Sequence, residues 1–240
     1  MTARSARPGK IVCVGRNYRE HAKELGNEVP KEPLIFLKPP SSVVWEGEAI
    51  VLPGASSKVE FEGEIGVVIA KTLTRVSEGE AIVLPKASTK VEFEGEIGVV
   101  IGKTLTRVSE SDAARGIRAI VAVNDVTARD LQKTDSQWTR AKGFDTFCPL
   151  GEESSKLPDL GSLSVVTRVN GVERQRGKSS EMVFSIPSLL AYISHIMTLE
   201  IGDLVATGTP SGVGPLVPGD VVEVEIPGVS RVSNPVQESR

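Results

Sequence analysis

The chain has 240 residues, which is enough for one large domain or two small ones with a substantial core. Its 28 basic and 31 acidic residues leave a net charge of −3 without any basic run, so the charge footprint of a nucleic-acid-binding protein is absent. No apolar stretch approaches the ~18 residues of a membrane-spanning helix, the first residues lack a signal-peptide core, and two cysteines fit a reducing compartment. We therefore expect a cytoplasmic protein with neither a nucleic-acid nor a membrane partner.

Short strands dominate the predicted elements, and helices are few. Apolar, partly β-branched runs bounded by turn residues predict strands at 10–14, 34–37, 117–123, 163–172, 204–207 and 221–226. The strand at 163–172 turns at Asn170-Gly171, which is a hairpin signal. Capping and periodicity predict helices at 17–26, from Ser109 onward, and at 186–197. This pattern favours a mainly β fold with small helices, of the α+β class.

A block of 32 residues occurs twice in succession, at 47–78 and 79–110. The two copies differ only at Gly54/Lys86, Ser57/Thr89 and Ala70/Gly102. A solenoid needs three or more units to bury a continuous core, and no third unit is present. We interpret the block as a tandem duplication within a single domain spanning 1–240. Each copy is predicted to form strands joined by a polar turn, and we expect one copy to be extruded.

Each copy carries a dense acidic segment, at 60–64 and at 92–96. Because side chains alternate along a strand, Glu92, Glu94 and Glu96 are predicted to share one face. Such a charge run is usually a solvated strand end, but here the strand continues as the apolar run 99–101, so we expect its acidic end to enter the interior. Buried carboxylates need a partner, and Glu-x-Glu with a third acid forms an oxygen-only site for Mg²⁺, Mn²⁺ or Ca²⁺. Asp125 follows another apolar strand and is the natural third ligand, although an Asp there is more often a cap or turn residue.

Two other groups of residues can carry chemistry. His21 and Glu24 are three positions apart on the predicted helix, where a carboxylate that orients an imidazole makes a general base near neutral pH. Surface His–Glu neighbours are nevertheless common. Lys38 and Lys142 can each bind an anion or remain solvated. The loop 208–214 resembles an anion-binding loop but lacks the Gly-Lys-Ser/Thr of a phosphate loop.

Several ordered motifs cover nearly the whole chain apart from one surplus copy of the block. They lie at 14–21, 36–40, 94–103, 124–132, 141–147, 208–216 and 218–220. Together they resemble the fumarylacetoacetate hydrolase family, in its short acylpyruvase-like branch. The resemblance implies a mixed β-sandwich roll, a homodimer, and a divalent cation held by Glu-x-Glu and by the Asp of the Asn-Asp-Val-Thr motif.

Carried onto this sequence, the resemblance implies a complete active site. The metal ligands are Glu94, Glu96 and Asp125, with Glu62 and Glu64 as the alternative pair. The catalytic residues are His21, Glu24 and Lys142, and the substrate-binding residues are Arg16, Lys38, Arg129, Gln132 and Thr209. The cation is Mg²⁺ or Mn²⁺, with Ca²⁺ as a further option.

The implied reaction is metal-dependent hydrolysis of a C–C bond in an acylpyruvate-type 2,4-dioxo acid, a small 2-oxo-acid substrate. The metal chelates the 2-oxo acid, the His–Glu dyad activates water, and Lys142 neutralises developing charge. The same site also suits oxaloacetate decarboxylation, isomerisation or sugar-acid dehydration. A metal-binding variant without activity is a further alternative.

The duplication leaves two candidate ligand pairs. Glu62 lies 41 residues after His21, and Asp125 lies 29 residues after Glu96, and both spacings resemble the family. We favour the second copy because Gly102 matches the family's Val-Val-Ile-Gly-Lys and Ala70 does not. Glu92 and Phe93 depart from the family, which often has His, Asp or Tyr there, and Glu92 is an extra acid that can compete for the cation.

Overall fold

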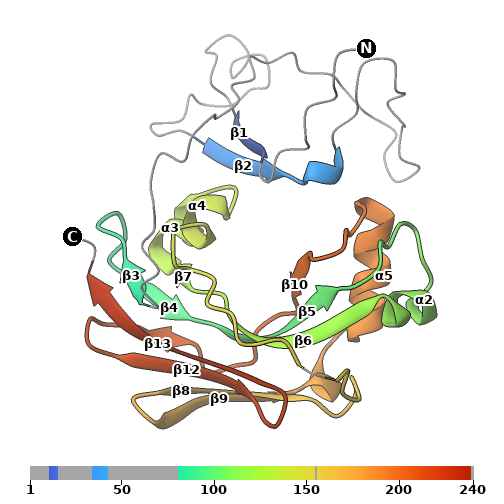
Figure 1. Ribbon diagram of the computed structural model, residues 1–240. Helices are drawn as coiled ribbons and strands as arrows, with labels where there is room; N and C mark the ends of the chain where they lie inside the picture. Colours follow the sequence, from blue (N-terminus) through green and yellow to red (C-terminus); the bar gives the residue numbers. More distant parts are fainter. Residues whose placement is uncertain (1–10, 16–33, 43–80, 155, 239–240) are drawn as a thin grey trace.

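The computed structural model describes residues 11–15, 34–42, 81–154 and 156–238 (Figure 1). Its strands are β1 (Ile11–Gly15), β2 (Leu34–Lys38), β3 (Ile82–Leu84), β4 (Val91–Phe93), β5 (Gly95–Ile101), β6 (Ile117–Asn124), β7 (Thr127–Ala128), β8 (Ser164–Val169), β9 (Val172–Lys178), β10 (Leu204–Ala206), β11 (Gly214–Pro215), β12 (Val221–Ile226) and β13 (Ser230–Glu238). Its helices are α2 (Glu110–Arg115), α3 (Arg129–Thr134), α4 (Thr139–Lys142) and α5 (Ile186–Ile196), with 3₁₀ turns η1 (Pro40–Ser42) and η2 (Ser179–Glu181). The predicted helix at 17–26 and the strands of the first copy lie outside the described residues.

Two layers of strands pack against each other (Figure 1). One layer is a five-stranded sheet in the order β3-β13-β12-β8-β9, in which β3 and β13 run parallel and the other pairs antiparallel. The other layer contains two three-stranded sheets, β10-β5-β6 and β11-β4-β7. Apolar side chains of β5, β6, β8 and β12 meet between the layers in one buried cluster that α5 also joins. The mixed, mainly β sandwich expected from the sequence is confirmed.

Local signals account for most of the predicted elements. Ser109 caps α2 by accepting a hydrogen bond from the backbone N–H of Asp112. Ser185 caps α5 in the same way, with Pro187 in the first turn, where its missing N–H costs nothing. Asn170 and Gly171 both have positive φ, as a tight hairpin turn between β8 and β9 requires.

The second copy of the block changes sheet part-way along its acidic segment. β4 pairs with β7 and β11, whereas β5 pairs with β6 and β10, and Glu94 lies at the junction between them. The simple alternation expected along 92–96 is therefore interrupted. All residues from Val91 to Ile101 are nevertheless buried, so the expectation that the acidic end enters the interior is confirmed.

Asp130 ties the polar turn of the second copy to α3. Its carboxylate accepts hydrogen bonds from the hydroxyls of Ser88 and Thr89 and from the backbone N–H of Thr89. Burial alone would raise the pKa of Asp130, but these hydrogen bonds and one from the backbone of Leu131 lower it to about 2. Asp130 therefore stays ionised and holds the block in place.

The two copies differ at position 102, where the second copy has glycine and the first has alanine. Only glycine fits against the neighbouring strand here. A Cβ on Gly102 would lie 2.8 Å from Cβ and 3.1 Å from Cα of Arg118 on the neighbouring strand. Ala70 occupies the matching position of the first copy. The first copy placed here would have to push the two strands apart.

We predict that Gly102→Ala lowers the free energy of unfolding by about 1–3 kcal/mol, the usual cost of forcing an extra methyl group into a packed contact. Urea denaturation of the full chain measures it. Thr89→Ser makes another exchange between the copies while keeping the hydroxyl that binds Asp130, and it should change stability by less than about 0.5 kcal/mol. Equal effects of the two substitutions would contradict this explanation.

Candidate metal centre

Three carboxylates converge at the junction of β4 and β5. Oxygen atoms of Glu94, Glu96 and Asp125 all lie within 4.8 Å of one another. Glu94 and Glu96 are 8% and 4% exposed, and Asp125 follows the end of β6. The structure thus brings together the three residues predicted as metal ligands, and their role in binding a metal stays a prediction. The alternative pair, Glu62 and Glu64, lies outside the described residues.

Backbone hydrogen bonds fix the junction on which the glutamates stand. The N–H of Glu94 donates to Oδ1 of Asn124 at 3.1 Å, and its carbonyl accepts from the N–H of Asp125 at 2.8 Å. The carbonyl of Gly95 accepts from the hydroxyl of Thr209 at 2.9 Å. The chain leaves one sheet and enters another here, so its backbone groups lack some of the usual hydrogen bonds to a neighbouring strand. The side chains of Asn124 and Thr209 supply hydrogen bonds in their place.

Two cations compensate part of the negative charge. Nζ of Lys142 lies 2.5 Å from Oδ2 of Asp125 and 3.1 Å from Oε2 of Glu94, and it also contacts the hydroxyl of Thr127. Arg129 donates to Oε1 of Glu94 at 2.5 Å. Burial alone would lower the pKa of Lys142, but its bonds to Asp125 and Glu94 raise it above the usual value. Lys142 therefore acts as a fixed positive charge and not as a base at neutral pH.

Glu96 is the carboxylate that these cations leave uncompensated. Within the described part of the chain it makes no ion pair, and its Oε2 accepts a single hydrogen bond, from the N–H of Gly208 at 2.7 Å. Burial raises the pKa of Glu96 to about 7, and the charges of Asp125 and Glu94 add to the rise. Burial likewise raises the pKa of Asp125, although Lys142 opposes it. An oxygen-only set with one unpaired buried carboxylate fits Mg²⁺ or Mn²⁺.

Glu92 precedes this cluster on β4 and is paired with two cations. Its carboxylate accepts from Nε of Arg129 at 2.8 Å and pairs with Nζ of Lys90 at 3.2 Å. Burial alone would raise the pKa of Glu92, but Arg129 and Lys90 lower it. The carboxylate is committed to these two cations, so the structure gives no support to competition between Glu92 and the triad for a metal ion.

The predicted substrate-binding residues are placed differently from one another. Arg129 uses its guanidinium on Glu92, Glu94 and the amide oxygen of Gln132, so in this structure it orients carboxylates. Thr209 lies in the loop after β10, and Lys38 is exposed on β2, which contacts α4. Their binding of substrate stays a prediction. Arg16, His21 and Glu24 lie outside the described residues.

Gln175 was missed by the sequence analysis. Its buried amide contacts Gly95, between the two glutamates, from a strand of the opposite layer. The strand that contains it is mostly polar, so its sequence shows no alternation of apolar residues that would predict a buried side chain at this position. The Asn170-Gly171 turn did place its strand next to β8, and that turn was the one available signal.

Comparison with known proteins agrees with this geometry. The profile described as fumarylacetoacetate (FAA) hydrolase C-terminal matches residues 10–82 and 74–237. The chain belongs to this family. The two matched segments overlap inside the doubled block, and each contains one copy of it.

Two curated relatives and one solved structure illustrate the similarity. The mitochondrial oxaloacetate tautomerase of Caenorhabditis elegans is 40% identical over 220 residues, 89% of this chain and 88% of the relative. The mitochondrial oxaloacetate decarboxylase of Dictyostelium discoideum is 38% identical over 227 residues, 92% of this chain and 89% of the relative. The solved 5-carboxymethyl-2-hydroxymuconate delta-isomerase of Mycobacterium smegmatis shares 35% identity and superposes with a TM-score of 0.66, over 98% of this chain and 80% of that one.

Among the described residues, no helix has the length and apolar character needed to cross a bilayer.

Replacing Glu96 tests whether it binds a cation without unfolding the protein. We predict that wild-type protein gains about 5–10 °C in melting temperature at a Mn²⁺ concentration of about 100 times Kd, since such saturation adds about 2.7 kcal/mol. Glu96→Gln removes an unpaired buried charge, so its melting temperature without metal should be equal or higher, and the Mn²⁺-dependent rise should disappear. Differential scanning fluorimetry with and without Mn²⁺ measures both. A Glu96→Gln variant that keeps the full rise would remove Glu96 from the site.

Proposed function

We propose that this protein is a divalent-metal-dependent enzyme that acts on a short 2-oxo acid through its enol or enolate form, with oxaloacetate as the leading substrate. The observation that carries the proposal is a carboxylate triad in which Glu96 makes no ion pair within the described residues, next to Lys142, which stays charged at neutral pH. A 2-oxo acid carries negative charge and gains more as an enolate forms, and a cation held by the triad would act with Lys142 to stabilise that charge.

Each described residue has a task in this proposal. Glu94, Glu96 and Asp125 would hold the cation, which would supply positive charge to polarise the 2-oxo acid. Lys142 keeps its proton and stabilises charge that develops on the substrate oxygen. Arg129 holds Glu94 in the orientation that the triad needs.

Oxaloacetate stands ahead of acylpyruvates because two named relatives act on oxaloacetate by their names, one as a tautomerase and one as a decarboxylase. Both reactions pass through an enol or enolate and need no attacking water. Acylpyruvate hydrolysis is the second candidate, and it is supported by the predicted His21–Glu24 dyad, which would activate that water. This order reverses the one that the sequence alone favoured.

We predict that Lys142→Met lowers kcat/KM by about 10²–10³-fold, the usual loss when one charge-stabilising donor is removed. Lys142→Arg should retain more activity because it keeps the charge. Lys133→Met, an exposed lysine on α3, is the matched control and should match wild type.

The assay also separates the two candidate functions. With Mn²⁺, tautomerisation shows as faster decay of oxaloacetate enol absorbance, decarboxylation as pyruvate formation, and hydrolysis as loss of acetylpyruvate enol absorbance with release of acetate. Full activity of Lys142→Met on every substrate would contradict the assigned role of this lysine. Absence of activity in wild-type protein on the whole panel would contradict the proposed function.

A further inference from the structure

Gln175 is a buried polar side chain in a strand whose other long side chains are mostly exposed. It lies on β9, in the five-stranded sheet, and is 1% exposed. Its neighbours Arg174 and Arg176 face solvent. A glutamine buried this completely is costly unless its amide is fully hydrogen-bonded.

Both the oxygen and the nitrogen of the Gln175 amide have hydrogen-bond partners. Oε1 accepts from the backbone N–H of Gly95 at 3.0 Å. Nε2 donates to the hydroxyl of Thr209 and to the carbonyl of Pro210, both at 2.8 Å. The hydroxyl of Thr209 in turn donates to the carbonyl of Gly95. Three segments far apart in sequence are thus closed into one hydrogen-bonded ring.

This ring acts on the two glutamates of the triad. Gly95 is the residue between Glu94 and Glu96, so a hydrogen bond to its N–H fixes the backbone from which both side chains extend. The loop 207–210 carries the N–H of Gly208 that binds Glu96. A Cβ on Gly95 would lie 1.9 Å from the hydroxyl oxygen of Thr167, so the close approach of the two layers depends on glycine there.

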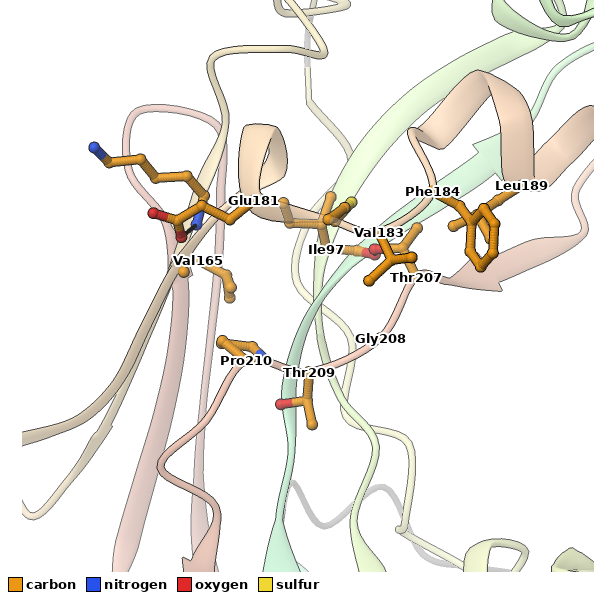
Figure 2. Close-up of a pocket in the computed structure, with 13 residues that line it drawn as sticks. Ile97, Val165, Glu181, Val183, Phe184, Leu189, Thr207, Gly208, Thr209 and Pro210 are labelled. Atoms are coloured by element: carbon orange, nitrogen blue, oxygen red, sulfur yellow. Dashed lines mark hydrogen bonds between the residues drawn. The ribbon is translucent and has the colours of Figure 1, made fainter.

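The same loop borders a cavity of about 300 Å³ (Figure 2). Val165, Val183 and Phe184 contribute to its mostly apolar lining, and Val183 and Phe184 are exposed. Figure 2 shows Gly208, Thr209 and Pro210 along one wall. Hydrogen bonds to β5 and β9 hold the loop in place beside this cavity.

We propose that Gln175 is a positioning residue for the metal centre. From the opposite layer it holds the β4–β5 junction and the 207–210 loop together, so that Glu94 and Glu96 converge on Asp125. This inference rests on the proposed function of the triad as a metal site. Methionine at position 175 would fill the same space but leave the Gly95 N–H and the Pro210 carbonyl without their partner.

The test compares Gln175→Met with Ser194→Ala in the full-length chain. Ser194 is a matched control because it is 2% exposed and makes hydrogen bonds to the backbone of Val108 and Ala191, away from the triad. Calorimetric titration with Mn²⁺ gives affinity, and urea denaturation without metal gives stability. We expect both variants to lose stability, but only Gln175→Met to bind Mn²⁺ about 10–100-fold more weakly, as losses of supporting contacts around metal ligands usually do.

Each outcome decides the matter. Mn²⁺ affinity within about twofold of wild type in Gln175→Met overturns the positioning role and leaves the proposed function standing. Wild-type protein that binds no Mn²⁺ overturns both. If Gln175→Met does not fold, Thr209→Val removes another bond of the same ring at similar volume, and the same affinity threshold then applies to it.

Discussion

Enclosure of three carboxylates at a junction between two sheets, two of them buried and that of Asp125 partly buried, is the constraint on which the rest of this structure depends. Moving a carboxylate out of water costs several kcal/mol unless cations or hydrogen bonds replace the water. Lys142 and Arg129 do this for Glu94 and Asp125, and Arg129 does it for Glu92 as well. The negative charge that remains without a paired cation is that of Glu96. One more cation at the triad would offset this charge, which is the basis of the proposed metal site.

This constraint also explains why only one of the two copies of the block can form the site. The candidate ligand pair occurs twice, as Glu62/Glu64 and as Glu94/Glu96, but the segments that carry Asp125, Lys142 and Arg129 are not duplicated. Only one copy can therefore lie against these three residues. Asp130 holds the turn of the second copy, and Gly102 gives that copy a closer fit against β6. The contact at Gly102 distinguishes the two copies, whereas Ser56 and Ser57 of the first copy carry the same kind of hydroxyl groups that Asp130 binds in the second.

Much of this arrangement was predictable from local sequence, and the remainder depends on contacts that local sequence does not show. Apolar runs and caps predicted β6, α2 and α5, and the Glu-x-Glu and Asp125 pattern predicted the triad. β13 was missed because polar residues fill much of it, and α3 because it buries no side chain and lacks a side-chain cap. Gln175 contacts a residue 80 positions away, across the two layers, and no periodicity reports such a contact.

The central claim is that one cation binds, and that the second copy of the block supplies its ligands. Mn²⁺ titration followed by electron paramagnetic resonance, on Glu62→Gln/Glu64→Gln and on Glu94→Gln/Glu96→Gln, tests it most directly because the two variants carry the same change in the two copies. We predict one tightly bound Mn²⁺ per chain in wild type and in the first variant, and none in the second. Loss of binding in the first variant with retention in the second, or two bound ions in wild type, would contradict the claim.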